Sequence, residues 1–306
     1  MSQYDDNLRN LYYYGRSHDN SRAVVQRFNI YRTNEEFKEF IFVEGKSDET
    51  FYQNTSIPIL RDKSKYLFAD YDRNPKAEIG KMAVCSAFEI IRKNEELRYE
   101  LDRCLFIIDK DYEFYKKNTV FTITDGHSME CYFLNRENID IIFSHYRLTK
   151  EEAIEFWKMY EDFADKCYEF YALKGTVTYM YKENEKYKGA GLVKKGYVDR
   201  YNYRQIFRFI FDEGSYSFCE DMLNEELELL RETIKANKNF IPYYQKLYAE
   251  IKNKPSMVRG HDAFEFLKQY LRQVHGIIIE DNLHELVPVI GEFSIALDIK
   301  LIENVL

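Results

Sequence analysis

Two short apolar runs that end in carboxylates constrain this chain more than any other feature. The first is EFIFVE, which reaches Glu44, and the second is RCLFIIDKD, which reaches Asp109 and Asp111. A continuous apolar run followed directly by acids is typical of a strand that is buried on both faces of a parallel sheet. Ligands of such sheets bind outside the carboxyl ends of the strands. The sequence therefore predicts that these acids lie at the ligand-binding edge of one sheet.

The segments around these runs predict an α/β fold with a mainly parallel sheet flanked by helices. Further strands are expected at 65–72 and 119–124, and a long helix at 77–101. Later in the chain the patterns are almost all helical, apart from a short strand or loop expected in HGIIIED. We therefore predict one domain at 1–147 with an N-terminal extension, and a mainly helical domain at 148–306.

The turns that follow the predicted strands add polar groups. Gly45 is expected to permit a sharp turn, and Ser47 to cap a helix that carries Asp48 in its first turn. His127 and Glu130 come from the segment TDGHSMECYFLN. Neighbouring carboxylates repel one another, and a divalent cation relieves that repulsion. Because Mg²⁺ prefers oxygen ligands and keeps several waters, two or three carboxylates suffice, and we predict a site for Mg²⁺ or Mn²⁺. Each acidic turn alone would be an ordinary loop, so the prediction depends on their combination.

Composition excludes some classes of protein. The formal net charge is −8 and 31% of residues are charged, which argues against a surface devoted wholly to nucleic acid. The five cysteines lack metal-finger spacing and indicate small buried hydrophobes in a reducing cytosol. No apolar run reaches the roughly 18 residues that a membrane span needs. We therefore expect a cytoplasmic protein with no membrane segment.

One stretch mixes basic and aromatic side chains. Its members are Lys194, Lys195, Arg200, Arg204 and Arg208, interleaved with Tyr197, Tyr201, Tyr203 and Phe207. Ordinary surface charge and a groove for a nucleic-acid backbone both remain open for it.

The block VEGKSDETFY, followed further along by FIIDKD, resembles the Toprim domain that topoisomerases, primases and OLD-family nucleases share. The blocks TDGHSMECYFLN and MVRGHDAFEFL resemble a family that joins a Toprim core to a helical C-terminal region. Members of that family often accompany an ABC-type or OLD-like ATPase. One branch supplies the nuclease effector of the PARIS anti-phage system.

The resemblance implies a role for each acid. Glu44 would act in acid–base chemistry and metal binding, and Asp109 and Asp111 would be the metal-binding pair. Asp48 would hold a second metal ion. Glu130 would be a further acid, from a strand that follows the Asp pair.

The resemblance also implies supporting groups. Lys46 would contact the scissile phosphate, and His127 would orient a phosphate or a water. The chain departs from the family that it resembles at His261, after Arg259-Gly260, where a lysine is often found. Another cation would have to serve in place of that lysine.

These features favour a Mg²⁺- or Mn²⁺-dependent endonuclease that acts as a toxic effector in anti-phage defence. RNA (transfer RNA in particular) or DNA would be its substrate. Because the chain has no GxxxxGK[ST] motif, nucleotide switching would have to come from a partner ATPase. By analogy with other Toprim nucleases, the active form is expected to be a homodimer. The alternative is a non-catalytic, metal-binding regulatory subunit of an ATPase complex, and a primase-like nucleotidyl transferase is a third hypothesis.

Overall fold

The computed structural model of the chain describes residues 20–61, 63–69, 80–112, 120–183, 220–253, 258, 260–279 and 286–291. It divides into two compact units. Among the described residues, the first unit holds those up to Asp109, those at 120–124 and Gly291, and the second holds 110–112 and 125–290. The domain boundary predicted after residue 147 falls inside the second unit.

The first unit is built on a parallel sheet with the strand order β2-β1-β3-β4. Its elements in chain order are α2 (Asn20–Tyr31), β1 (Glu39–Phe42), α3 (Lys46–Tyr52), α4 (Pro58–Arg61), β2 (Ser64–Leu67), α5 (Gly80–Lys93), the 3₁₀ helix η2 (Leu97–Arg103), β3 (Cys104–Ile108) and β4 (Phe121–Ile123). Each strand runs parallel to its neighbours. The predicted α/β fold with a parallel sheet is thus confirmed.

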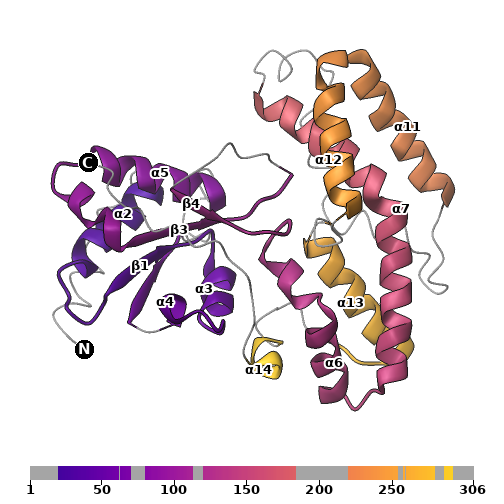
Figure 1. The fold of residues 1–306 in the computed structure, drawn as a ribbon, viewed down its shortest axis with the longest axis horizontal. Coiled ribbons are helices and arrows are strands. Elements are labelled where there is room, and N and C mark those ends of the chain that lie inside the picture. Colours follow the sequence, from indigo (N-terminus) through magenta and orange to yellow (C-terminus); the bar gives the residue numbers. More distant parts are fainter. Residues whose placement is uncertain are drawn as a thin grey trace. The chain divides into compact units, whose positions relative to one another are not determined.

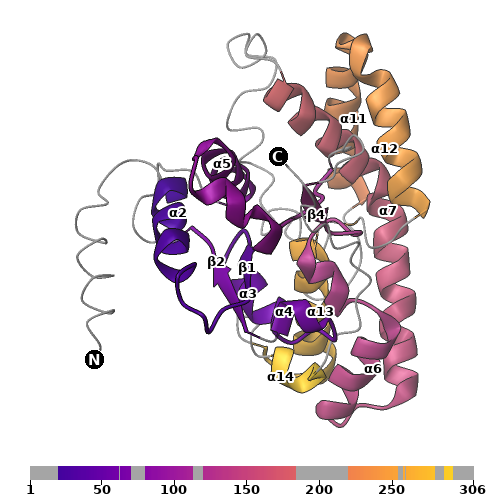
Figure 2. The same ribbon diagram turned by 60° about the vertical axis from the view of Figure 1, so that its left-hand side comes forward.

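The two central strands, β1 and β3, bury side chains on both faces of the sheet. Phe40, Phe42 and Phe106 belong to the core that α2 and α5 complete, and Phe42 stacks on Phe106 with ring centroids 4.5 Å apart. Ile41 and Ile107 alternate with them in the strands and are also buried. They face the side on which Figures 1 and 2 show α3 and α4. Burial on both faces explains why the sequence shows unbroken apolar runs instead of alternation.

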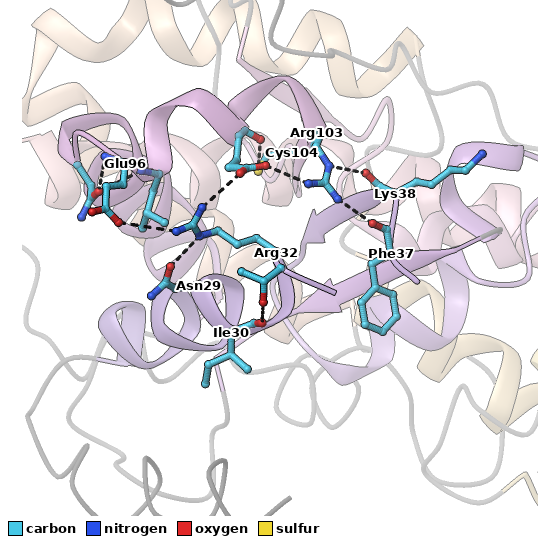
Figure 3. Close-up of polar contacts among 12 residues, drawn as sticks. Asn29, Ile30, Arg32, Phe37, Lys38, Glu96, Arg103 and Cys104 are labelled. Carbon is cyan, nitrogen blue, oxygen red and sulfur yellow. Dashed lines mark hydrogen bonds and ion pairs between the residues drawn. The ribbon is translucent and has the colours of Figure 1, made fainter. Parts of the chain in front are cut away.

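Two arginines close the amino edge of this sheet (Figure 3). Arg103 donates to the carbonyl oxygens of Phe37 and Lys38, at 2.7 and 3.0 Å. Arg103 and Arg32 both contact the carboxylate of Glu100, at 3.0 and 3.3 Å. These contacts tie the loop before β1 to the helix before β3, so this edge serves the fold.

Two local predictions in this unit are wrong. Gly45 has φ −161°, an extended conformation that any residue adopts, so the chain leaves β1 without a sharp turn. Because α3 begins at Lys46, Ser47 lies inside the helix and does not cap it. The helix predicted at 77–101 is also interrupted. The side chain of Asn94 accepts hydrogen bonds from the backbone of two following residues, which ends α5 and starts the 3₁₀ turn.

The second unit is helical in its described part. Its elements are the 3₁₀ helix η3 (Met129–Phe133), α6 (Arg136–His145), α7 (Lys150–Glu183), α11 (Glu220–Ala236), the 3₁₀ helix η4 (Lys238–Phe240), α12 (Ile241–Asn253), α13 (Gly260–His275) and α14 (Val287–Ile290). The long helix α7 packs against α6, α11 and α12. In HGIIIED, residues 276–279 form no regular element, and the basic and aromatic stretch at 194–208 lies outside the described residues. Within the described part of the chain, no helix combines the length and apolar character that a membrane crossing requires.

Candidate metal centre

Glu44 and Asp109 meet at the carboxyl edge of the sheet. Each follows one of the two central strands, which pair in parallel with Phe42 beside Phe106. The backbone N–H of Asp109 donates to Oε1 of Glu44 at 2.9 Å. Two of the predicted site residues are therefore in direct contact within the first unit.

Gly80 lies against the same carboxylate. It is the first residue of α5 and has φ +56°, a conformation that side chains rarely adopt. A Cβ placed on it would lie 3.3 Å from Oε2 of Glu44. Sequence reasoning missed this glycine, because nothing in AEIGKMAV shows that the residue approaches Glu44.

Asp48 lies in the first turn of α3 and is buried, with 8% of its surface exposed. A Cβ built on Gly45 would lie 3.6 Å from its Oδ2, an ordinary van der Waals distance. A carboxylate in the first helical turn is favoured by the positive end of the helix dipole. The predicted phosphate contact, Lys46, has an exposed side chain that pairs with Glu49 at 2.5 Å and lies 5.9 Å from the ring centre of Phe68.

Asp111 belongs to the second unit, although only one residue separates it from Asp109. Its φ is +50°, in the left-handed region that few non-glycine residues occupy. Its N–H donates to the carbonyl oxygen of His127 at 2.7 Å. The His127 ring is buried and meets the Tyr112 ring edge-to-face, with centroids 4.5 Å apart. The structure thus brings Asp111 together with the backbone of His127.

Glu130 was predicted to follow the Asp pair on a strand, but it lies in the 3₁₀ helix η3. Strand β4 ends at Ile123, and the chain has turned into η3 before it reaches Glu130. The carboxylate is buried, and its Oε1 lies 3.3 Å from Nδ1 of His261. Glu130 Oε2 and the Ser128 hydroxyl have no hydrogen-bond partner among the described residues.

The residue after His261, Asp262, is a second buried carboxylate that the sequence did not reveal. Asp262 is fully buried in the first turn of α13 and accepts a hydrogen bond from the Tyr171 hydroxyl at 2.9 Å. Burial, together with the nearby Asp262 carboxylate, raises the pKa of Tyr171 well above its usual range. The sequence offered no signal for this pair, because its members lie on separate helices far apart in the chain.

The donor chemistry of the first unit fits a hard cation. Glu44, Asp48 and Asp109 offer only carboxylate oxygens, which are the ligands that Mg²⁺ prefers. In the described part of the chain, however, no group of three or more His, Cys, Asp or Glu is arranged so as to hold a metal ion. The side chains would therefore have to adjust around a bound cation.

Comparison of the chain with protein-family models, with curated proteins and with solved structures returns no match.

Proposed function

We propose that this chain is a Toprim-type, metal-dependent nuclease and the toxic effector of an anti-phage defence system. The observation that best supports the proposal is the contact between Glu44 and Asp109 at the carboxyl edge of a parallel sheet. Parallel α/β sheets bind their ligands at this edge. The residues in contact are also those that the Toprim resemblance assigns to metal and acid–base chemistry.

Hydrolysis of a phosphodiester forms a bond from water oxygen to phosphorus and breaks one P–O bond, and the departing oxygen gains a proton. Glu44 and Asp109 would hold the cation, with Asp48 as a further ligand. The Toprim resemblance, and not the geometry, adds Asp111 and Glu130 to this set. The chemistry that Mg²⁺ or Mn²⁺ supplies when bound is neutralisation of the phosphodiester charge. Glu44 would accept the proton of the attacking water, because the Asp109 N–H fixes one of its oxygens and thereby orients the carboxylate.

The supporting roles are proposed on the sequence pattern. Lys46 would have to leave Glu49 in order to reach a phosphate, which its exposed position on α3 allows. His127 would act through its neighbours Tyr112 and Asp111. An ABC- or OLD-type ATPase would hold the enzyme inactive until infection. RNA, such as transfer RNA, is the proposed substrate, with DNA as the other possibility, and a homodimer is the proposed active form.

A second candidate function is a non-catalytic, metal-binding regulatory subunit. It would use the same carboxylates to hold a metal for structure alone. The two functions differ in one respect that can be measured. A nuclease loses cleavage when Glu44 is made neutral, whereas a regulatory subunit has no cleavage to lose.

The test compares two substitutions on the same strand. Glu44→Gln alters the carboxyl edge, and Glu39→Gln makes the same chemical change at the amino edge of β1. Each protein is incubated with total RNA and with plasmid DNA in Mg²⁺ or Mn²⁺, with and without an ABC- or OLD-type ATPase as the proposed partner. The nuclease predicts cleavage by wild type and Glu39→Gln, and at least a hundredfold less by Glu44→Gln. Equal cleavage by all three proteins would remove Glu44 from the chemistry.

A cellular experiment supplies the substrate class. Induction of wild type in bacteria should stop growth and produce a discrete RNA or DNA fragment, while Glu44→Ala should do neither. If wild type is harmless even with its ATPase, and nothing is cut, the regulatory-subunit hypothesis is favoured.

A further inference from the structure

The segment that carries Asp111 is held on both sides by side chains of α12. Lys110 forms an ion pair with Glu250, and both side chains are largely buried, at 17% and 21% exposed. The hydroxyl of Tyr243 donates to the carbonyl oxygen of Tyr112. One residue on each side of Asp111 is therefore fixed to the same helix.

Helix α7 completes the enclosure. A Cβ built on Gly175 would lie 2.7 Å from Cβ of Tyr112 and 2.7 Å from Cδ2 of Leu247. Only a glycine at this position of α7 leaves room for Tyr112 to pack. The Tyr112 ring also lies against Tyr171 of α7, with centroids 6.1 Å apart. Figures 1 and 2 both show α7 and α12 side by side. Tyr112 is consequently wedged between two packed helices.

The residues that α12 contributes share one helix face. Tyr243, Leu247 and Glu250 follow the i, i+4, i+7 spacing that places side chains in a row. Tyr243 is itself held by a parallel stack on Tyr179 of α7, at 4.0 Å with 2° between the ring planes. We call the four residues that grip the segment the α7/α12 socket; they are Gly175, Tyr243, Leu247 and Glu250.

Asp111 has a backbone conformation that few residues with a side chain adopt. Its φ is +50°, and contacts on both sides hold it there. The socket grips both neighbours, and the N–H of Asp111 is fixed on the His127 carbonyl at 2.7 Å. These contacts hold the backbone from which the Asp111 carboxylate extends.

We propose that the α7/α12 socket positions Asp111 for metal binding. The inference rests on the proposed function, in which Asp111 is a metal ligand, and it adds a role for helices that hold no ligand themselves. Groups that orient a ligand without touching the metal change metal affinity by about 10- to 100-fold when they are lost. Displacement of α12 along α7 would therefore weaken the metal site, which gives a partner of the helical unit a means of controlling it.

The test is Tyr243→Phe, which removes the hydroxyl that holds Tyr112 and keeps the ring that stacks on Tyr179. The matched control is Tyr244→Phe, the same change one residue along α12, where the hydroxyl bonds to Glu169 instead. Mn²⁺ binding to the full chain is measured by titration calorimetry, and exchange of the Asp111 amide hydrogen by deuterium labelling. Tyr243→Phe should weaken Mn²⁺ about tenfold and speed amide exchange, while Tyr244→Phe should do neither. Excess Mg²⁺ should restore the cleavage rate of Tyr243→Phe, because the ligands themselves remain.

The variant Asp111→Asn tells whether the positioning role fails alone or whether Asp111 is not a metal ligand at all. If Asp111→Asn loses Mn²⁺ affinity but Tyr243→Phe binds like wild type, the positioning role is refuted and the proposed function stands. If Asp111→Asn binds Mn²⁺ as wild type does, Asp111 is not a ligand, and both the proposed role of Asp111 and the positioning inference are lost. An equal drop in affinity for Tyr243→Phe and Tyr244→Phe would mean that general loosening of α12, and not the grip on Tyr112, is responsible.

Discussion

Gly260 begins α13 at a point where no larger residue fits. A Cβ at this position would lie 2.2 Å from Oγ of Ser128 and 2.9 Å from both Cβ and Oε2 of Glu130. The two neighbours are buried in the second unit, and the Glu130 Cβ is fixed to the backbone. Gly260→Ala therefore forces η3 and the start of α13 apart.

The change in the free energy of unfolding for Gly260→Ala follows from two opposing effects. Replacing glycine by alanine in a helix stabilises it by up to about 1 kcal/mol. Overpacking a buried contact costs about 1 to 3 kcal/mol, and the short contact with Ser128 places this site at the upper end. We therefore expect Gly260→Ala to lower the free energy of unfolding by about 2 kcal/mol.

The assay uses the single tryptophan of the chain. Trp157 lies on α7, so its fluorescence in a urea titration reports on the second unit. Ser128→Ala is the companion variant, because it removes a buried hydroxyl that has no partner among the described residues and should itself be close to neutral. The double variant should recover about 1 kcal/mol of the loss. An increase in stability for Gly260→Ala, or a loss that Ser128→Ala does not reduce, would refute the reasoning.

Three further predictions concern stability. Phe106→Ala, in the core of the sheet, should lower the free energy of unfolding by about 3 to 5 kcal/mol, measured by circular dichroism in denaturant. Arg231→Lys breaks the two-point contact with Glu169, in which both hydrogen bonds are 2.7 Å long. Because the pair is about one-third exposed, the free energy of unfolding should fall by only about 0.5 to 1 kcal/mol, measured by Trp157 fluorescence. Burial raises the pKa of Glu39, although the nearby Arg103 opposes the shift. Folding therefore favours the neutral form of Glu39, and the stability that this form contributes is lost as the pH rises. Glu39→Gln should accordingly be more stable than wild type at neutral pH, and a urea series should show the difference vanishing below a pH of about 4.

The elements of the sheet could be predicted because burial on both faces leaves a mark in the sequence. The runs before Glu44 and Asp109 contain almost nothing but apolar residues, as central parallel strands do. Parallel pairing then places both acids at one edge, and the hydrogen bond between them follows from the register. The interruption after α5 was missed, because helical periodicity continues through Asn94 while the side chain of that residue ends the helix.

Contacts between distant segments were beyond sequence reasoning. The resemblance pointed to His261 as a departure from the family's pattern, but it did not show that this residue meets Glu130. Gly80 and Gly175 each make room for a specific neighbour, and an isolated glycine within a helical pattern does not reveal which neighbour that is. The compact units also divide the Asp-Lys-Asp motif itself, between Asp109 and Lys110.

That division gives the motif a physical interpretation. Asp109 continues a strand whose position the sheet fixes, whereas Asp111 adopts a left-handed backbone conformation that few residues with a side chain take. Aspartate tolerates this conformation better than most residues, because its short side chain can hydrogen-bond locally. Lys63 and Arg147 adopt the same conformation in turns, so what sets Asp111 apart is the ion pair of Lys110 and the packing of Tyr112 on either side of it. On the proposed function, the held backbone of Asp111 would set where its carboxylate begins, as a metal ligand requires.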